Sequence, residues 1–329
     1  MKLSIIIPFV GEWAQIVFTL RAVAELAQDA CDFEVIAVDN WCHDVEAQGR
    51  TPDRGHAHVD KDGKKHPSHI QTMAAKNSWL KYVHYEEKLS HWNAKRAGVE
   101  ASTGDWLLFL DAHVVPSRRA IERQAYWFER LLETHGEKTT LHLPLTYHIL
   151  ETHRLVYRLV DERATGNVAY SFCGYHETEE PYEVACMSTC GMMITRRFYD
   201  QIGGWPIELG IYSGGEHYMN FAGAICGLRK FITPGVTLHH HGEKRGYHWN
   251  YDDSVRNRAI ACYLFGGEEY LDRWLAHKKG RPQVLEFIGR NVLASCAEHR
   301  KLIEAQQVTT IDDWLDEWTR REPQPTLTT

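Results

Sequence analysis

An acidic residue and a histidine stand two positions apart at the end of an apolar run. Residues 106–110 read Trp-Leu-Leu-Phe-Leu and are followed by Asp111, Ala112 and His113. The run predicts a buried strand, and residues i and i+2 of an extended chain point to the same side. A carboxylate with an imidazole suits Mn²⁺, or Mg²⁺, and leaves positions open for diphosphate oxygens. The alternative is an aspartate that caps a helix beside an ordinary histidine.

A second candidate is the carboxylate in Gly214-Gly215-Glu216-His217. The two glycines permit backbone turns that other residues tolerate poorly. Glu216 then begins a helix that we expect over residues 218–226, where the helix dipole favours a negative charge. Glu216 therefore either contacts a substrate hydroxyl or caps this helix.

A third candidate is the run His239-His240-His241, which ends an extended segment expected over residues 236–240. Because side chains alternate along an extended chain, only one or two of these histidines can face a single site. The run is either a source of a third metal ligand or a solvated histidine cluster.

The elements that must position these residues begin at the N-terminus. Residues 3–8 predict a buried strand, residues 12–27 a helix, and residues 33–38 a second buried strand ending at Asp39. This order predicts a parallel sheet with ligand chemistry at the carboxyl ends of its strands. Further strands are expected over residues 82–85, 106–110, 140–147, 185–195, 230–234 and 236–240, with an edge hairpin inside 151–183. Further helices are expected over residues 91–101, 119–133, 196–202, 218–226, 255–265, 268–275, 283–293 and 310–318. Residues 41–78 are polar, contain five histidines, and predict a long functional or mobile loop.

Composition limits the class of protein. The 329 residues are 43% hydrophobic and 25% charged, with a net charge of -7, which is ordinary for a soluble globular protein and argues against a general nucleic-acid-coating role. Pro8 stops the N-terminal apolar run too early for a signal peptide or a membrane span. The eight cysteines contain no CxxC pair, so we expect reduced thiols and a cytoplasmic protein.

The order of these motifs resembles that of family 2 glycosyltransferases. It resembles even more their relatives, the polypeptide N-acetylgalactosaminyltransferases, which carry a DxH metal motif, a GGEN segment and a later metal-binding histidine. The matching segments are Ile5-Ile6-Ile7-Pro8, Val38-Asp39, Phe109-Leu110-Asp111-Ala112-His113, Gly203-Gly204-Trp205, Gly214-Gly215-Glu216 and His240. The resemblance covers roughly residues 3–245. It implies a GT-A fold, an α/β architecture with a mostly parallel central sheet flanked by helices, over residues 1–245, followed by a helical C-terminal extension over residues 246–329.

The same resemblance implies roles for individual residues. Asp39 would contact the uracil, and the basic pair Lys95-Arg96 would face the diphosphate. Six positions after Pro234 comes His240, which would complete the metal site, with His239 as runner-up. The implied nucleotide-binding residues are Pro8, Phe9, Val10, Glu12, Asp39, Lys95, Arg96, Asp111, Ala112, Trp205 and Gly215. The implied metal ligands are Asp111, His113 and His240, and the implied catalytic residues are Asp111 and Glu216.

Three features depart from the family pattern. His217 replaces the asparagine of GGEN, no lectin domain is present, and the two adjacent acids near the acceptor of family 2 enzymes are missing. An inverting enzyme needs a general base at the acceptor, which Glu216 could be, whereas a retaining enzyme does not. Both stereochemical outcomes stay open.

The resemblance implies a nucleotide-sugar donor, most simply a UDP-sugar, and a hydroxyl acceptor. The acceptor is either a glycan or glycolipid precursor, or a hydroxymethylated base in DNA, as for a phage enzyme acting in the host cytoplasm. DNA would need basic residues interleaved with aromatic ones, although solvated helix faces explain the same pattern. The basic residues are Lys244, Arg245, Arg256, Arg258, Arg273, Lys278, Lys279 and Arg281, and the aromatic ones are Tyr247, His248, Trp249 and Tyr251. A non-catalytic nucleotide-sugar or carbohydrate-binding protein on the same fold is the alternative from another class, and it would more readily have lost Asp111, His113 or Glu216.

Overall fold

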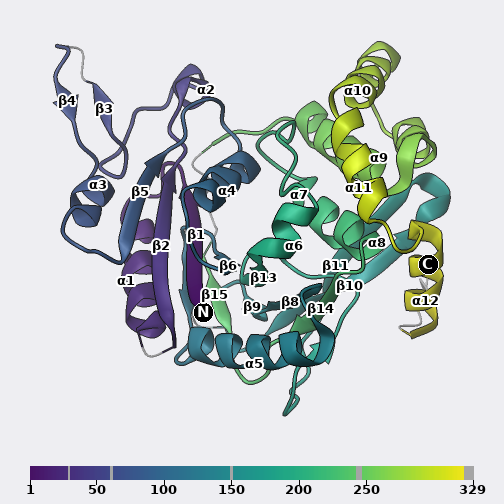
Figure 1. Cartoon of the computed structure of the whole chain (residues 1–329). Coiled ribbons are helices and arrows are strands. Elements are labelled where there is room, and N and C mark those ends of the chain that lie inside the picture. The colour runs from purple at the N-terminus through teal and green to yellow at the C-terminus, as the bar shows by residue number, and fades with distance from the viewer. Residues whose placement is uncertain (29, 60–61, 149–150, 242–246, 322–329) are drawn as a thin grey trace.

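A mixed eight-stranded sheet forms the centre of the molecule (Figure 1). The computed structural model describes residues 1–28, 30–59, 62–148, 151–241 and 247–321. The strand order is β12-β14-β8-β13-β6-β1-β2-β5, and four of the seven pairings are parallel because β13 runs against both of its neighbours and β12 against β14. The strands are β1 (Lys2–Phe9), β2 (Asp32–Asp39), β5 (Leu80–His84), β6 (Trp106–Phe109), β8 (Thr139–His142), β12 (Tyr182–Glu183), β13 (Met192–Thr195) and β14 (Arg229–Ile232).

Helices cover both faces of this sheet, and alternate residues of β1 show why. Ile5 and Ile7 pack in the hydrophobic cluster that includes α1 and α5, whereas Ile6 packs in the cluster that includes α4 and the C-terminal helices. A strand buried on both faces is apolar without alternation, which is the pattern that predicted it. The helices next to the sheet are α1 (Gln15–Ala27), α4 (His91–Glu100), α5 (Ala120–His135) and α6 (Arg196–Gln201).

A second, five-stranded sheet has the order β11-β10-β9-β15-β7. Its strands are β7 (Val114–Pro116), β9 (Leu145–Thr146), β10 (Leu155–Glu162), β11 (Asn167–Gly174) and β15 (Leu238–His240). The prediction of one strand over residues 140–147 was wrong, because β8 and β9 lie in different sheets on either side of Leu143 and Pro144. A proline lacks the N–H that a continuing strand would need. The expected hairpin inside residues 151–183 is the antiparallel pair β10–β11.

Residues 41–78 contain more regular structure than the predicted loop. They hold α2 (His43–Ala47), β3 (His58–Val59), β4 (Lys65–His66) and α3 (His69–Ala74). The Ser68 hydroxyl caps α3 by accepting a hydrogen bond from the Gln71 N–H. Buried Val45 and Ile70 fix the two helices to the rest of the molecule.

The expected helix over residues 218–226 is interrupted. It consists of α7 (Gly215–His217), the π-helical segment η2 (Tyr218–Ala222) and α8 (Gly223–Ile225). A π-helical turn inside a helix often accompanies a functional site, and this one begins directly after Glu216 and His217.

Four helices form the C-terminal region and gather at one end of the molecule (Figure 1). They are α9 (Tyr251–Ala276), α10 (Pro282–Ser295), α11 (Ala297–Gln306) and α12 (Ile311–Arg321). The two helices expected over residues 255–265 and 268–275 both lie within α9 and are separated at Gly267, whose φ of 71° and ψ of -163° are not helical. The helix α11 was not predicted. Phe265 and Ile303 belong to the same hydrophobic cluster as residues of the central sheet. The predicted domain boundary at residues 245 and 246 lies outside the described residues, and the division into two domains stays a prediction.

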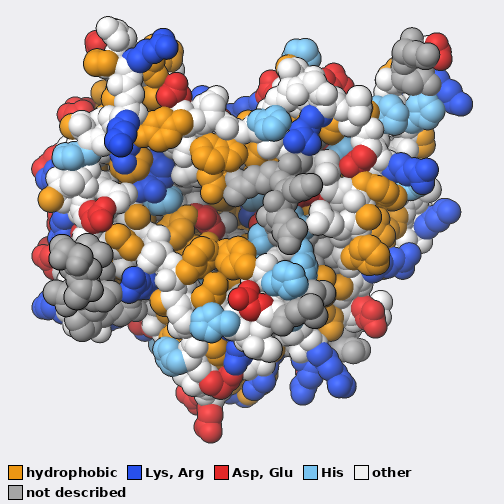
Figure 2. All heavy atoms as spheres, turned by 180° about the vertical axis from the view of Figure 1, so that it is seen from behind, with side chains coloured by type: hydrophobic (Ala, Val, Ile, Leu, Met, Phe, Trp, Pro, Cys, Tyr) orange, Lys and Arg blue, Asp and Glu red, His pale blue; other side chains and the backbone are white. Residues whose placement is uncertain are grey.

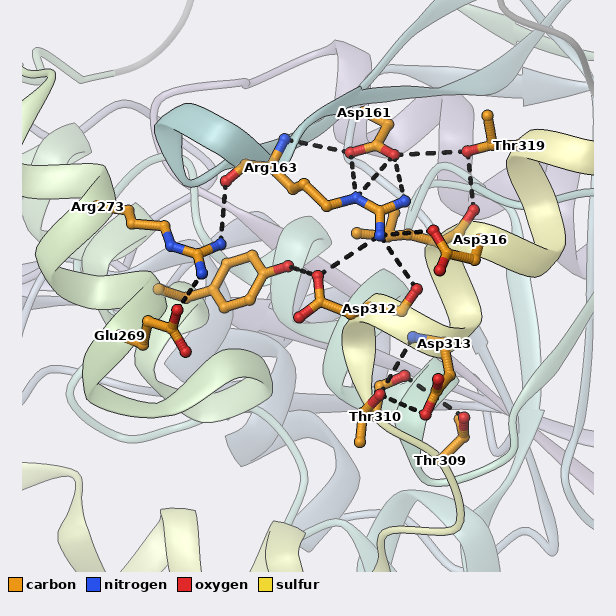
Figure 3. A network of polar contacts seen from close by, with 12 residues as sticks. Asp161, Arg163, Glu269, Arg273, Thr309, Thr310, Asp312, Asp313, Asp316 and Thr319 are labelled. Atoms are coloured by element: carbon orange, nitrogen blue, oxygen red, sulfur yellow. Dashed lines mark hydrogen bonds and ion pairs between the residues drawn. The ribbon is translucent and has the colours of Figure 1, made fainter.

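A polar network ties the tip of the β10–β11 hairpin to α12 (Figure 3). Arg163, in the short helix η1 (Arg163–Thr165) at the tip, pairs with Asp161 at 2.6 Å and with Asp316 at 2.8 Å. Gly166, the residue directly after η1, has a φ of +69°, and a Cβ there would lie 2.5 Å from the Trp274 backbone nitrogen. Only glycine fits this close approach, so the hairpin is held firmly against α9 and α12.

Along the described residues, no helix is both long and apolar enough to cross a lipid bilayer.

Candidate active site

Three ligand-type side chains from separate elements meet beyond the carboxyl end of β6. Asp111 follows β6, His113 precedes β7, and His240 ends β15. Antiparallel pairing sets His240 opposite Val114, which brings its ring to 4.7 Å from that of His113, at 90°. One ligand atom from each of the three residues lies within 4.8 Å of the other two. One carboxylate and two imidazoles at this separation can hold a divalent ion and leave coordination positions open.

Cationic and imidazole groups surround the Asp111 carboxylate. Lys95 Nζ lies 3.5 Å from Oδ1, His91 Nε2 lies 3.6 Å from Oδ1, and His240 Nε2 lies 3.4 Å from Oδ2. Burial favours the protonated acid, but Lys95, His240, His91 and His113 outweigh it and hold the pKa of Asp111 well below its usual range. Lys95 is fully buried on α4. The carboxylate is therefore ionised, as a metal ligand must be.

Glu12 orients His113. Glu12 Oε1 lies 2.7 Å from His113 Nδ1, and Glu12 Oε2 accepts a hydrogen bond from the Val10 N–H at 3.1 Å. An imidazole that donates from Nδ1 to a carboxylate presents Nε2 to a metal. Glu12 thus occupies the position of a carboxylate that supports a metal ligand.

The neighbours of His240 point elsewhere. His239 Nδ1 lies 2.9 Å from the Thr146 hydroxyl on β9. The His241 ring lies beside that of His148, with 6.4 Å between their centres. Among the described residues, it is His240 that joins Asp111 and His113 in the cluster, and its role as a metal ligand stays a prediction.

The Glu216 carboxylate accepts hydrogen bonds from three residues of other elements. The Tyr170 hydroxyl donates to Oε2 at 2.6 Å, and the Thr189 N–H donates to Oε1 at 3.1 Å. The hydroxyls of Ser188 and Thr189 each lie 3.4 Å from Oε1. Burial and Glu216 raise the pKa of Tyr170 well above its usual value, so the phenol remains a donor. A Cβ on Gly215 would lie 2.2 Å from the Trp92 ring, which explains why glycine precedes this glutamate.

These groups line one cavity of about 590 Å³. The face turned away from the viewer in Figure 1 is hollowed near its centre, where hydrophobic side chains and histidines gather (Figure 2). The predicted residues that line the cavity are Pro8, Phe9, Val10, Glu12, Asp111, Ala112, His113, Glu216 and His240. The predicted residues outside its lining are Asp39, Lys95, Arg96, Trp205 and Gly215.

Asp39 is fully buried and holds a histidine that the sequence did not indicate as a site residue. Its carboxylate lies 2.6 Å from His56 Nδ1 and accepts hydrogen bonds from the Tyr82 hydroxyl at 2.6 Å and the Trp41 N–H at 2.9 Å. His56 Nε2 in turn accepts from the Gly11 N–H at 2.7 Å. Through His56, Asp39 fixes the loop after β1, and the contact of Asp39 with a base stays a prediction.

Arg96 and Trp205 lie outside the cavity lining and hold the backbone segments next to it. The Arg96 guanidinium donates to the carbonyls of Gly203 at 3.1 Å and Trp205 at 3.2 Å. The fully buried Trp205 indole donates to the Gly215 carbonyl at 3.2 Å. The turn at Gly203 is thereby connected to the segment that carries Glu216. Direct contact of Arg96 and Trp205 with a nucleotide stays a prediction.

Comparison with known proteins identifies the fold. The model of the glycosyl transferase family 2 matches residues 59–134. The structure of GalNAc-T7 with UDP, GalNAc and Mn²⁺ superposes with a TM-score of 0.68 at 16% identity, over 99% of this chain and 58% of that chain. The chain therefore has the GT-A fold of glycosyltransferases.

N-acetylgalactosaminyltransferase 6 of Drosophila melanogaster is 24% identical over 182 residues, which are 52% of this chain and 26% of the fly protein. The chain thus spans about a quarter of that relative and little more than half of the GalNAc-T7 chain. It resembles the polypeptide N-acetylgalactosaminyltransferases, as its motifs predicted.

Proposed function

We propose that the protein is a metal-dependent glycosyltransferase that moves a sugar from a nucleotide diphosphate sugar, a UDP-sugar in the simplest case, to a hydroxyl acceptor. The cluster of Asp111, His113 and His240 at the wall of the large cavity carries this proposal. Its mixed carboxylate and imidazole donors fit Mn²⁺. GalNAc-T7, which shares the fold, was solved with UDP, GalNAc and Mn²⁺.

In this proposal Asp111, His113 and His240 would hold the ion, and a bound ion would neutralise charge on the departing diphosphate. Glu12 keeps His113 in one orientation through the bond at its Nδ1. Lys95 keeps Asp111 ionised and adds a buried positive charge beside it. Glu216 accepts a hydrogen bond from a substrate hydroxyl, because its carboxylate lines the cavity in a fixed orientation.

For the acceptor we propose a glycan-type hydroxyl. The basic C-terminal residues that suggested DNA are largely engaged within the protein: Arg256 pairs with Asp253 at 2.9 Å, Arg273 pairs with Glu269, and Lys278 lies over the Trp274 ring. Lys244 and Arg245 lie outside the described residues. The described cations therefore give DNA binding no particular support. All eight cysteines are free thiols, which supports the proposal of a reducing, cytoplasmic compartment.

A donor screen tests the proposal. Thermal shifts would be measured with UDP- and GDP-sugars, with Mn²⁺ and with EDTA, and nucleotide release would be followed with the donors that bind. We expect Mn²⁺-dependent stabilisation by a UDP-sugar, and turnover that Asp111→Ala abolishes. Binding without turnover against any hydroxyl acceptor would favour the non-catalytic binding protein, and turnover unchanged in Asp111→Ala would refute the metal site.

A further inference from the structure

The cavity has a second polar region, formed by residues of α7 and α9, that the proposed transfer chemistry does not use. Arg258 of α9 lines the cavity. Its guanidinium donates to the Asn167 side-chain oxygen at 2.9 Å and to the Val168 carbonyl at 3.4 Å, and it lies 4.5 Å from the centre of the Trp274 ring. All of these partners are uncharged. The Arg258 Nε atom is buried and has no hydrogen-bond partner in the described part of the chain.

Within the described residues, no carboxylate pairs with the charge of Arg258. Burial lowers the pKa of Arg258, and the groups that raise it are Cys262 and Tyr170. Both are neutral, because burial raises the pKa of Cys262 to about 11 and that of Tyr170 well above its usual value. Arg258 as a whole is only partly buried, but its Nε atom is inaccessible to solvent, and an uncompensated charge that has lost part of its hydration is costly.

His217 adds a second unsatisfied group. This histidine, which stands where the GGEN pattern has asparagine, is buried and lines the same cavity. Its Nδ1 is buried without a hydrogen-bond partner among the described residues, and its ring lies 4.7 Å from that of Tyr170. Burial, and then the charge of Arg258, hold its pKa well below the usual value. The neutral imidazole can donate one hydrogen bond to an oxygen of a ligand.

The surroundings fit a sugar ring that carries a negative charge. Lys278 and Trp274 lie outside the cavity lining, but Lys278 Nζ is 3.2 Å from the centre of the Trp274 ring that Arg258 also contacts, so a second positive charge lies near Arg258. On the hairpin, the rings of Tyr157 and Tyr170 stack at 4.6 Å and 6° and line the cavity. A guanidinium binds a carboxylate through its fork of N–H donors, and flat aromatic faces suit sugar rings.

We propose that Arg258 and His217 form a subsite for a sugar carboxylate, so that one of the two sugar substrates is a uronic acid. This inference rests on the proposed function, because it names the chemistry of a substrate in the same cavity. It does not depend on whether the acid belongs to the donor or to the acceptor.

Paired ligands that differ only in the carboxylate test the subsite. Affinities would be measured by calorimetry for UDP-glucuronate against UDP-glucose with Mn²⁺, and for free glucuronate against glucose with UDP and Mn²⁺ present and also absent. We expect the acid of one pair to bind about tenfold or more tightly than its neutral partner, as a charge-assisted pair in a buried site allows. A preference within the UDP-sugars assigns the acid to the donor, and a preference within the free sugars assigns it to the acceptor.

Two variants and a matched control complete the experiment. Arg258→Gln removes the charge and keeps a donor for Asn167, and it should abolish the preference for the acid. His217→Phe keeps a ring against Tyr170 and should reduce the preference for the acid. This variant tests the subsite if Arg258→Gln does not fold. Arg256→Gln, on the same helix but paired with Asp253, should leave the preference intact.

Equal affinities for acid and neutral sugars in both pairs, or a preference that survives in Arg258→Gln, would overturn the subsite. The proposed function has its own contradicting result, which is that UDP does not bind in the presence of Mn²⁺. The arm with free sugars and no nucleotide tests the subsite even in that case.

Discussion

Removing the Tyr170 hydroxyl should loosen Glu216 and slow turnover. The hydroxyl donates to Glu216 Oε2 at 2.6 Å and is the shortest of the hydrogen bonds to this carboxylate. A distance of 2.6 Å is in the range of charge-assisted O–H···O⁻ bonds. Such a bond to a charged group contributes about 1.5–3 kcal/mol. Tyr170→Phe should therefore lower the free energy of unfolding by this amount, and the melting temperature by roughly 2–4 °C.

The effect on catalysis follows from the freed carboxylate. With its shortest bond gone, the remaining donors to Glu216 within the described residues are those of Ser188 and Thr189 at Oε1. We expect kcat to fall about tenfold to a hundredfold, as for other misplaced catalytic groups, with KM for the donor unchanged. Denaturant unfolding and steady-state kinetics with a saturating UDP-sugar measure the two quantities.

Tyr157→Phe is the matched control. Tyr157 stacks on Tyr170, and its hydroxyl bonds Ser188. Both variants therefore lose a hydroxyl from the same hairpin, but among the described tyrosines it is Tyr170 that donates directly to Glu216. Comparable losses of kcat in the two variants would refute the reasoning, because they would show that the loss does not depend on the direct hydrogen bond to Glu216. Full activity of Tyr170→Phe would equally refute it.

Three further predictions concern the metal cluster and the hairpin. Asp111→Ala should abolish Mn²⁺-dependent turnover while the circular dichroism spectrum stays that of the wild type; a collapsed spectrum would show a structural role instead. His240→Ala should weaken Mn²⁺ binding in calorimetry at least about tenfold more than His241→Ala, and equal losses would contradict the assignment of His240. Gly166→Ala should lower the melting temperature, because its Cβ would clash with the Trp274 backbone in a left-handed conformation; an unchanged melting temperature would contradict this account of the hairpin tip.

The buried strands could be predicted from the sequence because a single cause, burial on both faces, determines their apolar character. β1, β2 and β6 are covered on both faces over most of their length, so each contains a continuous apolar run, at residues 5–9, 35–38 and 106–109. The predicted spans 3–8, 33–38 and 106–110 match Lys2–Phe9, Asp32–Asp39 and Trp106–Phe109 within one residue at each end. The chemistry at the end of β6 follows from the same cause, since the strand leads directly to Asp111.

Other elements depend on contacts between distant parts of the chain. α11 was missed because its one fully buried residue is Ile303, which leaves little apolar periodicity to detect. The hairpin was expected only in outline, because its strands are half-buried and alternate weakly.

The residues of the site, too, could be predicted from the sequence only where their placement has a local cause. His240 could be selected by its spacing from Pro234, but its approach to His113 comes from the register of β15 on β7. Tyr170 reaches Glu216 from 46 residues away, and Arg258 reaches the cavity from a helix that was expected to be a separate extension. No local pattern in the sequence encodes these contacts.

The most direct test of the central proposal is the affinity of UDP for the wild type and for Asp111→Asn, measured by calorimetry with Mn²⁺ and with EDTA. A metal bound by Asp111, His113 and His240 that contacts the diphosphate should make UDP bind about tenfold or more tightly in Mn²⁺ than in EDTA. The variant should lose this difference. Equal affinity in Mn²⁺ and EDTA for the wild type, or an undiminished difference in Asp111→Asn, would contradict the proposal.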